Sequence, residues 1–362
     1  MKLLIVIGTR PNFIKVTRFK EVAKTIDGLT VEIVHTGQHY DRKMSEIFLD
    51  QFNLRPDHFL SLRGEDAASH FGNMIVDLGN LISDIKPDVV MVPGDVNSSL
   101  AGALAAHRCN VSIAHLESGL RSRDRNMPEE INRILIDQIS DFHFVTESSG
   151  MKNLYSEGLT PLIDSPKVLV GNTMIDTLVK HKSDIENSTI IEELGINGAY
   201  CLCTMHRPSN VDHKEGVIFI INMLEELVKK CVVVFPIHPR SRINIVNLGL
   251  YDKLKGINGV VITEPLGYFD FQKLIAESKF VVTDSGGIQE ETTFCNIPCI
   301  TIRENTERPI TIEKGTNHLV GRDLPAILNA VENPKRCTPP EFWDGYTTER
   351  VLDTLLNSEL RN

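Results

Sequence analysis

Short apolar runs alternate with amphipathic stretches along almost the whole chain. The apolar runs are rich in Val and Ile, which is typical of strands buried on both faces of a parallel sheet. In the first half, the predicted strands cover residues 3–7, 31–35, 89–92, 112–115, 142–145 and 168–170. In the second half, they cover residues 200–204, 232–236, 260–262, 280–283 and 298–302. Strands spaced in this way, with helical patterns between them, predict repeated βαβ units.

The stretches between the strands have the period of helices. They predict helices over residues 12–26, 67–85, 98–107, 129–139 and 150–157, and then over 215–229, 269–277, 288–294 and 325–331. The polar residues 181–197 join the two halves. We therefore predict an α/β protein with two doubly wound, Rossmann-like domains that face a central cleft, 1–172 and 173–345. A last amphipathic stretch, 347–360, predicts a C-terminal helix that crosses the domain junction, and we expect residues 346–362 to pack back on the first domain.

Composition and charge narrow the class of protein. With 362 residues, of which 41% are hydrophobic and 24% charged, the chain has room for two ordinary globular domains. Its net charge of −10 argues against a nucleic-acid or membrane-surface binder. No apolar stretch approaches the ~20 residues that span a bilayer, and the run at residues 3–7 is a strand rather than a signal peptide. Seven cysteines without a CxxC pair predict reduced thiols in a cytoplasmic protein.

Polar residues gather where the predicted strands end. In doubly wound sheets, ligands bind beyond the carboxyl ends of the strands. In the first half these ends carry Gly8-Thr9-Arg10-Pro11 with Lys15 in the next helix, Thr36-Gly37-Gln38-His39, Pro93-Gly94-Asp95 and the run 115–121. In the second half they carry Met205-His206-Arg207-Pro208, Ile237-His238-Pro239-Arg240, Asp284-Ser285-Gly286-Gly287 and Arg303-Glu304. Their repetition at one edge of both sheets indicates a binding site there.

These residues fall into two chemical sets. A cationic set suits a diphosphate, through charge-assisted bonds and the N–H groups at a helix start; it comprises Arg10, Lys15, His206, Arg207, His238, Arg240, Arg308 and the Ser285-Gly286-Gly287 turn. An acidic set from the first half suits general acid–base chemistry; it comprises Asp95, Glu117, Glu129 and Glu130. Two alternatives stay open: the Ser-Gly-Gly turn also fits an ordinary capped helix start, and Pro128-Glu129-Glu130 also fits a common one.

Several nucleotide and metal sites are disfavoured. No GxGxxG follows the first strand and no GxxxxGK[ST] occurs, so NAD binding and an ATPase P-loop are not predicted. The carboxylates have no histidine-containing metal-ligand spacing, so we predict no metal site.

Taken together, the motifs resemble those of the non-hydrolysing UDP-N-acetylglucosamine 2-epimerases, which have the two-domain glycosyltransferase-B architecture. The resemblance runs almost end to end. It covers Gly8-Thr9-Arg10-Pro11 with Lys15, Thr36-Gly37-Gln38-His39, Gly94-Asp95, residues 115–121, Pro128-Glu129-Glu130-Ile131-Asn132-Arg133, His206-Arg207, residues 283–291 and Thr306-Glu307-Arg308-Pro309.

The resemblance implies a reaction and roles for the residues. UDP-GlcNAc and UDP-ManNAc would be interconverted for surface polysaccharide precursor supply, by eliminating UDP to a 2-acetamidoglucal and adding it back. The implied catalytic residues, mainly from the first domain, are Asp95, Glu117 and Glu129 as proton donors and acceptors, with His206 and Lys15. The implied UDP-binding residues are Arg10, Lys15, His206, His238, Ser285, Gly286, Gly287, Glu291 on the ribose, and Arg308. The resemblance also implies a homodimer that needs no cofactor or metal.

Departures from the family pattern leave the sugar open. Tyr40-Asp41-Arg42 follows His39 where many members have Arg-Glu, in the region that they use to bind a second, activating UDP-GlcNAc, so the sequence does not predict that activation. The stretch between Arg121 and Pro128 is short, and Pro208-Ser209-Asn210 follows His206-Arg207. A related UDP-acetamido sugar is therefore an alternative substrate. A glycosyltransferase of the same architecture, a hydrolysing epimerase and a non-catalytic nucleotide-sugar sensor are alternative functions.

Overall fold

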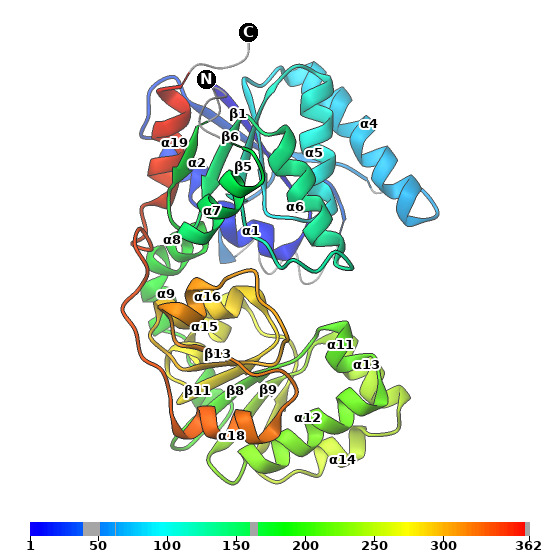
Figure 1. Cartoon of the computed structure of the whole chain (residues 1–362), viewed down its shortest axis with the longest axis vertical. Coiled ribbons are helices and arrows are strands. Elements are labelled where there is room, and N and C mark those ends of the chain that lie inside the picture. The colour runs from blue at the N-terminus through cyan, green and yellow to red at the C-terminus, as the bar shows by residue number, and fades with distance from the viewer. Residues whose placement is uncertain (39–50, 62, 160–165, 359–362) are drawn as a thin grey trace. The chain divides into compact units, whose positions relative to one another are not determined.

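The chain folds into two compact units. The computed structural model describes residues 1–38, 51–61, 63–159 and 166–358, with the backbone alone at residue 10. Unit 1 comprises Met1–Lys180 and Glu341–Asn362, and unit 2 comprises His181–Pro340 (Figure 1). Each unit contains one parallel sheet whose strands mostly alternate with helices in the described residues, which confirms the predicted α/β class.

Unit 1 contains a seven-stranded parallel sheet in the order β3-β2-β1-β4-β5-β6-β7. Its strands are β1 (Lys2–Ile7), β2 (Thr30–His35), β3 (His58–Phe59), β4 (Val89–Pro93), β5 (Ser112–Ser118), β6 (Phe142–Val145) and β7 (Lys167–Leu169). The central strands are buried on both faces, as their continuous apolar sequence predicts. The two-residue β3, paired with the end of β2, was not predicted because it is too short to have an apolar period.

The helices of unit 1 lie on both sides of this sheet. They are α1 (Arg10–Val16), α2 (Phe19–Ala23), α4 (Ala67–Ile85), α5 (Asn97–Arg108), α6 (Pro128–Ile139), α7 (Ser148–Ser156), α8 (Thr173–Lys180) and α19 (Thr347–Leu356). Figure 1 shows α4, α5 and α6 together on one side, with α2 and α19 on the other. Buried side chains such as Leu78, Ile82 and Ala101 fill the core between α4, α5 and the sheet.

The predicted helix over residues 12–26 is two helices, α1 and α2. The Thr177 hydroxyl of α8 donates to the Ile14 carbonyl at 2.5 Å, and this bond competes with continuation of α1. Because α8 contacts α1 in this way, unit 1 extends to Lys180, eight residues beyond the expected boundary at 172.

The C-terminal helix belongs to unit 1, where it contacts α2 and α8. The buried Asp176 of α8 caps it. This carboxylate accepts from the backbone N–H groups of Thr347 at 3.1 Å and Thr348 at 2.6 Å, and from the Thr348 hydroxyl at 2.7 Å. Trp343 is buried beside this segment, and its indole N–H donates to the Thr146 carbonyl at 3.1 Å.

We expect Asp176→Ala to lower the free energy of unfolding of unit 1 by about 2–3 kcal/mol, because three donors lose a charged acceptor. Trp343 is the single tryptophan of the chain, so its fluorescence during urea unfolding reports on unit 1. Asp353→Ala, at an exposed position of the same helix, is the matched control and should change the value by less than about 0.5 kcal/mol. Equal losses in the two variants would contradict the capping role.

Unit 2 contains a six-stranded parallel sheet in the order β10-β9-β8-β11-β12-β13. Its strands are β8 (Tyr200–Thr204), β9 (Val232–Pro236), β10 (Val260–Thr263), β11 (Phe280–Thr283), β12 (Cys299–Thr301) and β13 (Asn317–Leu319). Its helices are α9 (Lys182–Glu186), α10 (Ile190–Glu193), α11 (Pro208–Val211), α12 (Lys214–Leu227), α13 (Pro239–Asn247), α14 (Tyr251–Lys255), α15 (Tyr268–Ala276), α16 (Gly286–Phe294), α17 (Ile310–Glu313) and α18 (Leu324–Glu332).

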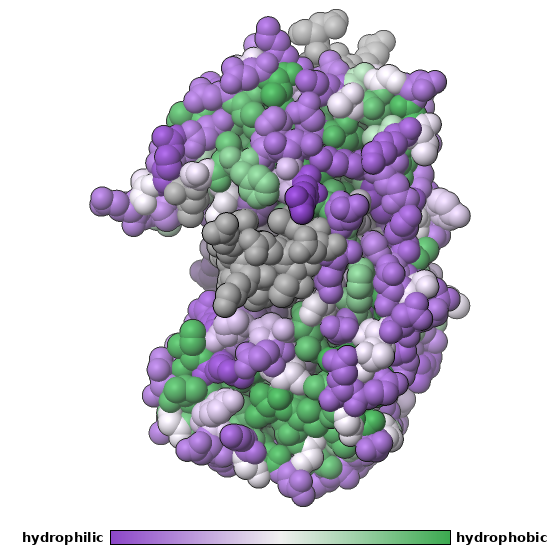
Figure 2. Space-filling model, turned by 180° about the vertical axis from the view of Figure 1, so that it is seen from behind, coloured by the Kyte–Doolittle hydropathy of each residue, from purple (hydrophilic) through white to green (hydrophobic). Residues whose placement is uncertain are grey.

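The surfaces of the two units differ in the view of Figure 2. Hydrophilic residues cover most of unit 1, whereas green hydrophobic residues gather on the visible face of unit 2. Within the described ranges, no helix combines the length and the apolar character that crossing a membrane requires.

Candidate active site

The candidate residues lie at the point where the strand order of each sheet reverses. In unit 1 this point lies between β1 and β4, and in unit 2 between β8 and β11. Loops that leave two such neighbouring strands diverge to opposite faces of the sheet, which opens a ligand site at their carboxyl ends. Asp95 follows β4, while His206 and Asp284 follow β8 and β11.

A buried ion pair forms the centre of the unit 1 site. Lys15 Nζ of α1 donates to Glu117 Oε2 of β5 at 2.5 Å, and the side chains are 7% and 3% exposed. The second oxygen, Glu117 Oε1, is buried and has no hydrogen-bond partner in the described part of the chain. A carboxylate with one oxygen held and the other available is suited to proton transfer.

The backbone of Glu117 is strained. Its φ of 71° lies in the left-handed region, which costs a non-glycine residue of the order of 1 kcal/mol or more. The pairing of β5 with β6 shifts register between Leu116 and Ser118, so Glu117 lies at a bulge. Bulges re-aim side chains next to active sites, and this one directs the Glu117 carboxylate to Lys15.

Gly94 lies against this ion pair, and Asp95 follows it in the chain. Gly94 has φ 66°, and a Cβ there would lie 2.9 Å from Lys15 Nζ and 3.4 Å from Glu117 Oε2. A side chain at this position would be strained and would crowd the ion pair, so glycine is favoured here. The Asp95 carboxylate is ion-paired with Arg133 of α6, and its backbone carbonyl accepts from Asn132 Nδ2 at 2.9 Å. The two residues of α6 thus hold Asp95 in place.

The acidic pair at the start of α6 has two different environments. Glu130 is buried and accepts from the backbone N–H groups of Ser122 and Arg123, both at 2.8 Å, and from Arg133 Nη1 at 2.8 Å. It therefore fixes the loop before the helix. Glu129 is exposed in the first turn of α6, where its carboxylate is accessible to a ligand.

In unit 2, Asp284 orients His206. The fully buried Asp284 carboxylate accepts from the backbone N–H groups of His206 and Arg207, and from Asn210 Nδ2 at 3.0 Å. Burial raises the pKa of this carboxyl, but the bond from His206 and the other donors lower it further, so its pKa is below the usual range. His206 Nδ1 lies 2.9 Å from Asp284 Oδ1, which leaves Nε2 of this 37%-exposed ring for a ligand.

The Ser-Gly-Gly turn begins α16, as predicted. Ser285 is the N-cap residue, yet its hydroxyl makes no capping hydrogen bond to the helix. The Asp284 carboxylate bonds instead to His206, Arg207 and Asn210. The first N–H groups of α16 are thus not used by a cap, and this favours the anion-binding interpretation of the turn over the ordinary capped helix start.

Arg308 adds a cation beside this helix start. Its Nη1 lies where a Cβ at Gly286 would be only 2.7 Å away. Its Nε is 2.8 Å from Glu290 Oε2 and its Nη1 is 3.3 Å from Glu307 Oε2, and both glutamates are buried. Two carboxylates therefore hold the guanidinium over Gly286, in the orientation that suits an anion at the helix start.

The other predicted cationic and acidic residues of unit 2 lie in separate environments. The ring of His238 lies 5.5 Å from the His206 ring, and its Nδ1 accepts from the Arg240 N–H at 3.2 Å at the start of α13. Arg240 is ion-paired with Asp212 at the surface. Glu291 is buried in α16 near Cys295, where burial raises the pKa of the thiol to about 12 and the Glu291 carboxylate adds to the rise.

Some predicted residues cannot be placed, and others were missed. His39 and Tyr40-Asp41-Arg42 lie outside the described residues, and Arg10 is described only as the first residue of α1. No catalytic or binding role was predicted for Arg133 and Asp284. Arg133 follows Glu130 by three residues, which places them on one helix face, and Asp284 follows its strand as Asp95 follows β4. Both residues could have been recognised as candidates from these positions in the sequence.

His35 at the end of β2 titrates far from its usual range. Burial lowers the pKa of this 1%-exposed ring to about 4. The unfolded chain, with a histidine pKa of ~6.5, therefore binds a proton that the folded chain does not bind as the pH falls towards 4. The folded protein is therefore stabilised by the neutral His35 ring above the unfolded-state pKa, and it loses this stabilisation as the pH falls towards the folded-state pKa.

We expect the free energy of unfolding to fall by about 3 kcal/mol as the pH is lowered from 6.5 to 4, because of His35. His35→Gln removes the titration, so the stability difference between the wild type and this variant should change with pH over this range. Urea unfolding followed by Trp343 fluorescence measures it. The exposed His107→Gln control should keep the wild-type dependence, and a His35→Gln protein with the same dependence would contradict the assignment.

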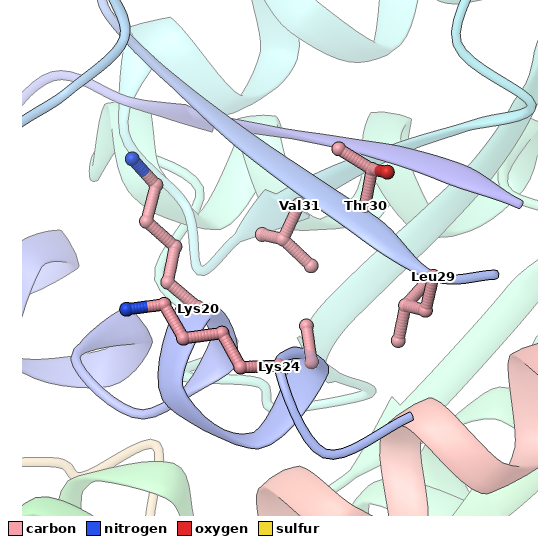
Figure 3. Close-up of a pocket in the computed structure, with 6 residues that line it drawn as sticks. Lys20, Lys24, Leu29, Thr30 and Val31 are labelled. Carbon is pink, nitrogen blue, oxygen red and sulfur yellow. The ribbon is translucent and has the colours of Figure 1, made fainter. Parts of the chain in front are cut away.

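A surface depression of unit 1 lies away from these residues. It is lined by Lys20, Ala23 and Lys24 of α2 and by residues 29–31 where β2 begins (Figure 3). This is the amino end of β2, opposite to the edge that carries the candidate residues. Lys20 Nζ there donates to Asp57 Oδ1 at 2.8 Å. Within the described residues, no three of His, Cys, Asp and Glu cluster in a way that could hold a metal ion.

Comparisons with known proteins agree on one family. A family model described as UDP-N-acetylglucosamine 2-epimerase matches residues 21–356. A UDP-N-acetylglucosamine 2-epimerase of Methanocaldococcus jannaschii is 38% identical, over 98% of this chain and 99% of its own. A UDP-2,3-diacetamido-2,3-dideoxy-D-glucuronate 2-epimerase of Pseudomonas aeruginosa is 40% identical, over 98% of this chain and 99% of its own.

Solved structures give the same result. The M. jannaschii UDP-GlcNAc 2-epimerase in complex with UDP-GlcNAc and UDP has a TM-score of 0.90, covering 98% of this chain and 99% of its own. The Neisseria meningitidis UDP-GlcNAc 2-epimerase bound to UDP-GlcNAc has a TM-score of 0.89 at 30% identity, covering 99% of this chain and 100% of its own. The family resemblance and the fold expected from the motifs are thereby confirmed. The chain belongs to the UDP-N-acetylglucosamine 2-epimerase family and is an isomerase.

Proposed function

We propose that this enzyme interconverts UDP-GlcNAc and UDP-ManNAc without net hydrolysis. The observation that carries the proposal is the buried Lys15–Glu117 pair, in which a strained residue presents one unpartnered carboxylate oxygen and the pair lies against Gly94, the residue before Asp95. The M. jannaschii and N. meningitidis structures, which contain UDP-GlcNAc, support the substrate.

The proposed reaction begins with loss of the diphosphate. The C2 proton is weakly acidic, so cleavage of the C1–O bond leads or accompanies its removal. The electron pair of that bond leaves with UDP, and the pair of the C2–H bond forms the C1–C2 double bond of a 2-acetamidoglucal. Addition reverses these steps, with a proton delivered to the opposite face of C2. Stabilisation of the departing diphosphate is then the largest electrostatic task.

Unit 2 supplies residues for that task. The uncapped start of α16 at Ser285, Gly286 and Gly287, together with Arg308, suits the diphosphate oxygens. His206, oriented by Asp284, presents Nε2 to the same leaving group. We assign His238 and Arg10 to further contacts with UDP, and Glu291 to the ribose.

Unit 1 supplies the proton-transfer groups. We assign Asp95, Glu117 and Glu129 to proton exchange at C2, since inversion requires transfer on two faces that one fixed carboxylate serves poorly. Lys15 neutralises Glu117 while the leaving group departs. The reaction needs no external oxidant or reductant, and cationic residues of this chain suit the diphosphate charge, so we propose that neither a cofactor nor a metal takes part.

A second candidate substrate has a specific observation in its favour. The P. aeruginosa relative, named for a UDP-diacetamido-glucuronate, is 40% identical to this chain, against 38% for the M. jannaschii relative. Both names describe 2-epimerases, so the chemistry at C2 is shared and the substituents at C3 and C6 differ. Both sugars should therefore be tested.

Incubation of the enzyme with each UDP-sugar in D₂O, followed by proton NMR, tests the proposal. We expect the C2 proton signal to disappear, a manno-configured UDP-sugar to appear, and little free UDP to accumulate. Stoichiometric free sugar and UDP would indicate a hydrolysing epimerase. Absence of C2 exchange with either sugar would refute the epimerase and favour a glycosyltransferase or a sensor.

We further propose that the enzyme is a homodimer in the cytoplasm that supplies a surface polysaccharide precursor. The seven cysteines are free thiols, which is consistent with a reducing compartment. Light scattering coupled to size-exclusion chromatography should give twice the 40.5 kDa of one chain. A mass of one chain would contradict the dimer.

A further inference from the structure

A buried histidine–aspartate pair lies directly behind the unit 1 site. His115 of β5 and Asp137 of α6 are each 0% exposed. His115 Nδ1 lies 2.6 Å from Asp137 Oδ1, and Nε2 lies 3.0 Å from the Gly94 carbonyl oxygen. Neither Lys15 nor Glu117 bonds to this pair, so the proton-transfer chemistry assigned above does not use it.

The hydrogen bonds determine the charge of the ring. The Gly94 carbonyl can only accept, so His115 Nε2 must carry a proton. Asp137 is ionised, because it accepts from the Ser118 hydroxyl and the Gly119 N–H while Arg121 Nη1 lies 2.7 Å away. His115 Nδ1 must then carry a proton as well. The ring is an imidazolium that donates in two fixed directions.

The two donors connect the backbone segments that carry Asp95 and Glu117. Gly94 directly precedes Asp95, and its N–H donates to the Leu116 carbonyl at 2.8 Å. Ser118 and Gly119 directly follow Glu117, and both donate to Asp137. Glu117 in its strained conformation is therefore held on both sides, and the turn of Asp95 is held to the same pair.

We infer that His115 and Asp137 are positioning residues that fix Asp95 and Glu117 relative to each other for proton transfer at C2. The inference rests on the proposed function, because it concerns the same reaction. A displacement of about 1 Å of a catalytic group is enough to cost of the order of 100-fold in rate. Loss of the pair should therefore lower kcat and leave the affinity for UDP almost unchanged, because neither His115 nor Asp137 is among the residues assigned to UDP.

The test compares two buried histidines that both contact Asp137. His115→Gln removes the cation and one of the two donors. His143→Gln is the matched control, because His143 is also 0% exposed but its Nε2 bonds to the Asp137 backbone carbonyl at 2.8 Å. For each variant we would measure kcat and KM for the UDP-sugar, the Kd for UDP, the rate of C2 deuterium exchange and the melting temperature.

We expect His115→Gln to lower kcat and C2 exchange by about 100-fold, with KM and the UDP Kd within threefold of wild type. His143→Gln should keep kcat within threefold of wild type, even if its melting temperature falls as far as that of His115→Gln. If His115→Gln keeps a wild-type kcat, or if both variants lose kcat in proportion to stability, the inference is wrong.

If the His115→Gln protein does not fold, two further variants test the inference. Asp137→Asn keeps the shape and removes the charge, and Ser118→Ala removes a single donor to Asp137. Both should lower kcat without changing the UDP Kd, and unchanged kcat in both would overturn the inference. A wild-type enzyme without C2 exchange would instead refute the proposed function, so the two failures are distinguishable.

Discussion

Glu117→Gln should lower the rate of deuterium incorporation at C2 by about 10³-fold, within the range that general acid–base groups contribute. The amide has the same shape and its oxygen can still accept from Lys15, so the backbone and the unit 2 residues that we assign to UDP should be unaffected. NMR of the UDP-sugar in D₂O gives the rate, and isothermal titration with UDP gives the affinity.

The control for this variant is Glu32→Gln. Glu32 is a partly exposed glutamate of the same sheet that is ion-paired with His58 and Lys2. It should retain wild-type exchange. A Glu117→Gln enzyme that exchanges C2 within threefold of wild type would remove Glu117 from the reaction.

Lys15→Met should lower the free energy of unfolding of unit 1 by about 3–5 kcal/mol, because it leaves the Glu117 carboxylate buried without its cation. Methionine nearly preserves the volume of the side chain, so the loss is electrostatic rather than a packing defect. Urea unfolding followed by Trp343 fluorescence measures it.

The double variant Lys15→Met/Glu117→Gln separates the charge effect from other effects. It should be more stable than Lys15→Met alone, because the uncompensated charge is gone. Additive losses from the two single substitutions would show that the pair does not interact in the folded protein.

The sequence predicted most of the sheet architecture, because parallel strands buried on both faces appear as continuous apolar runs. It did not predict β13, in which Asn317 is polar yet buried. Its side chain bonds to Thr301 and Gln289, and such partners are known only once the fold is formed. The break between α1 and α2 was missed for the same reason, since Thr177 is distant in sequence from Ile14.

The site was predictable as far as it follows from strand ends. The sequence placed Asp95, His206 and the Ser-Gly-Gly turn at strand ends, because each follows closely after an apolar run. The left-handed backbone of Glu117 was not predictable, since nothing in a glutamate favours that conformation. Nor were the Asp95–Arg133 and His206–Asp284 pairs, because each joins segments that only the fold brings together.

The division of the chain into units has a consequence for biosynthesis. Residues 181–340 form a compact unit that is inserted before the last helix of unit 1. Domains generally fold as units while the chain emerges from the ribosome. Here the synthesis of unit 2 is complete before that of unit 1, because α19 emerges last. Only then can Asp176, which emerged earlier, cap this helix. A nascent chain truncated before Thr347 would therefore contain all residues of unit 2 but an unfinished unit 1.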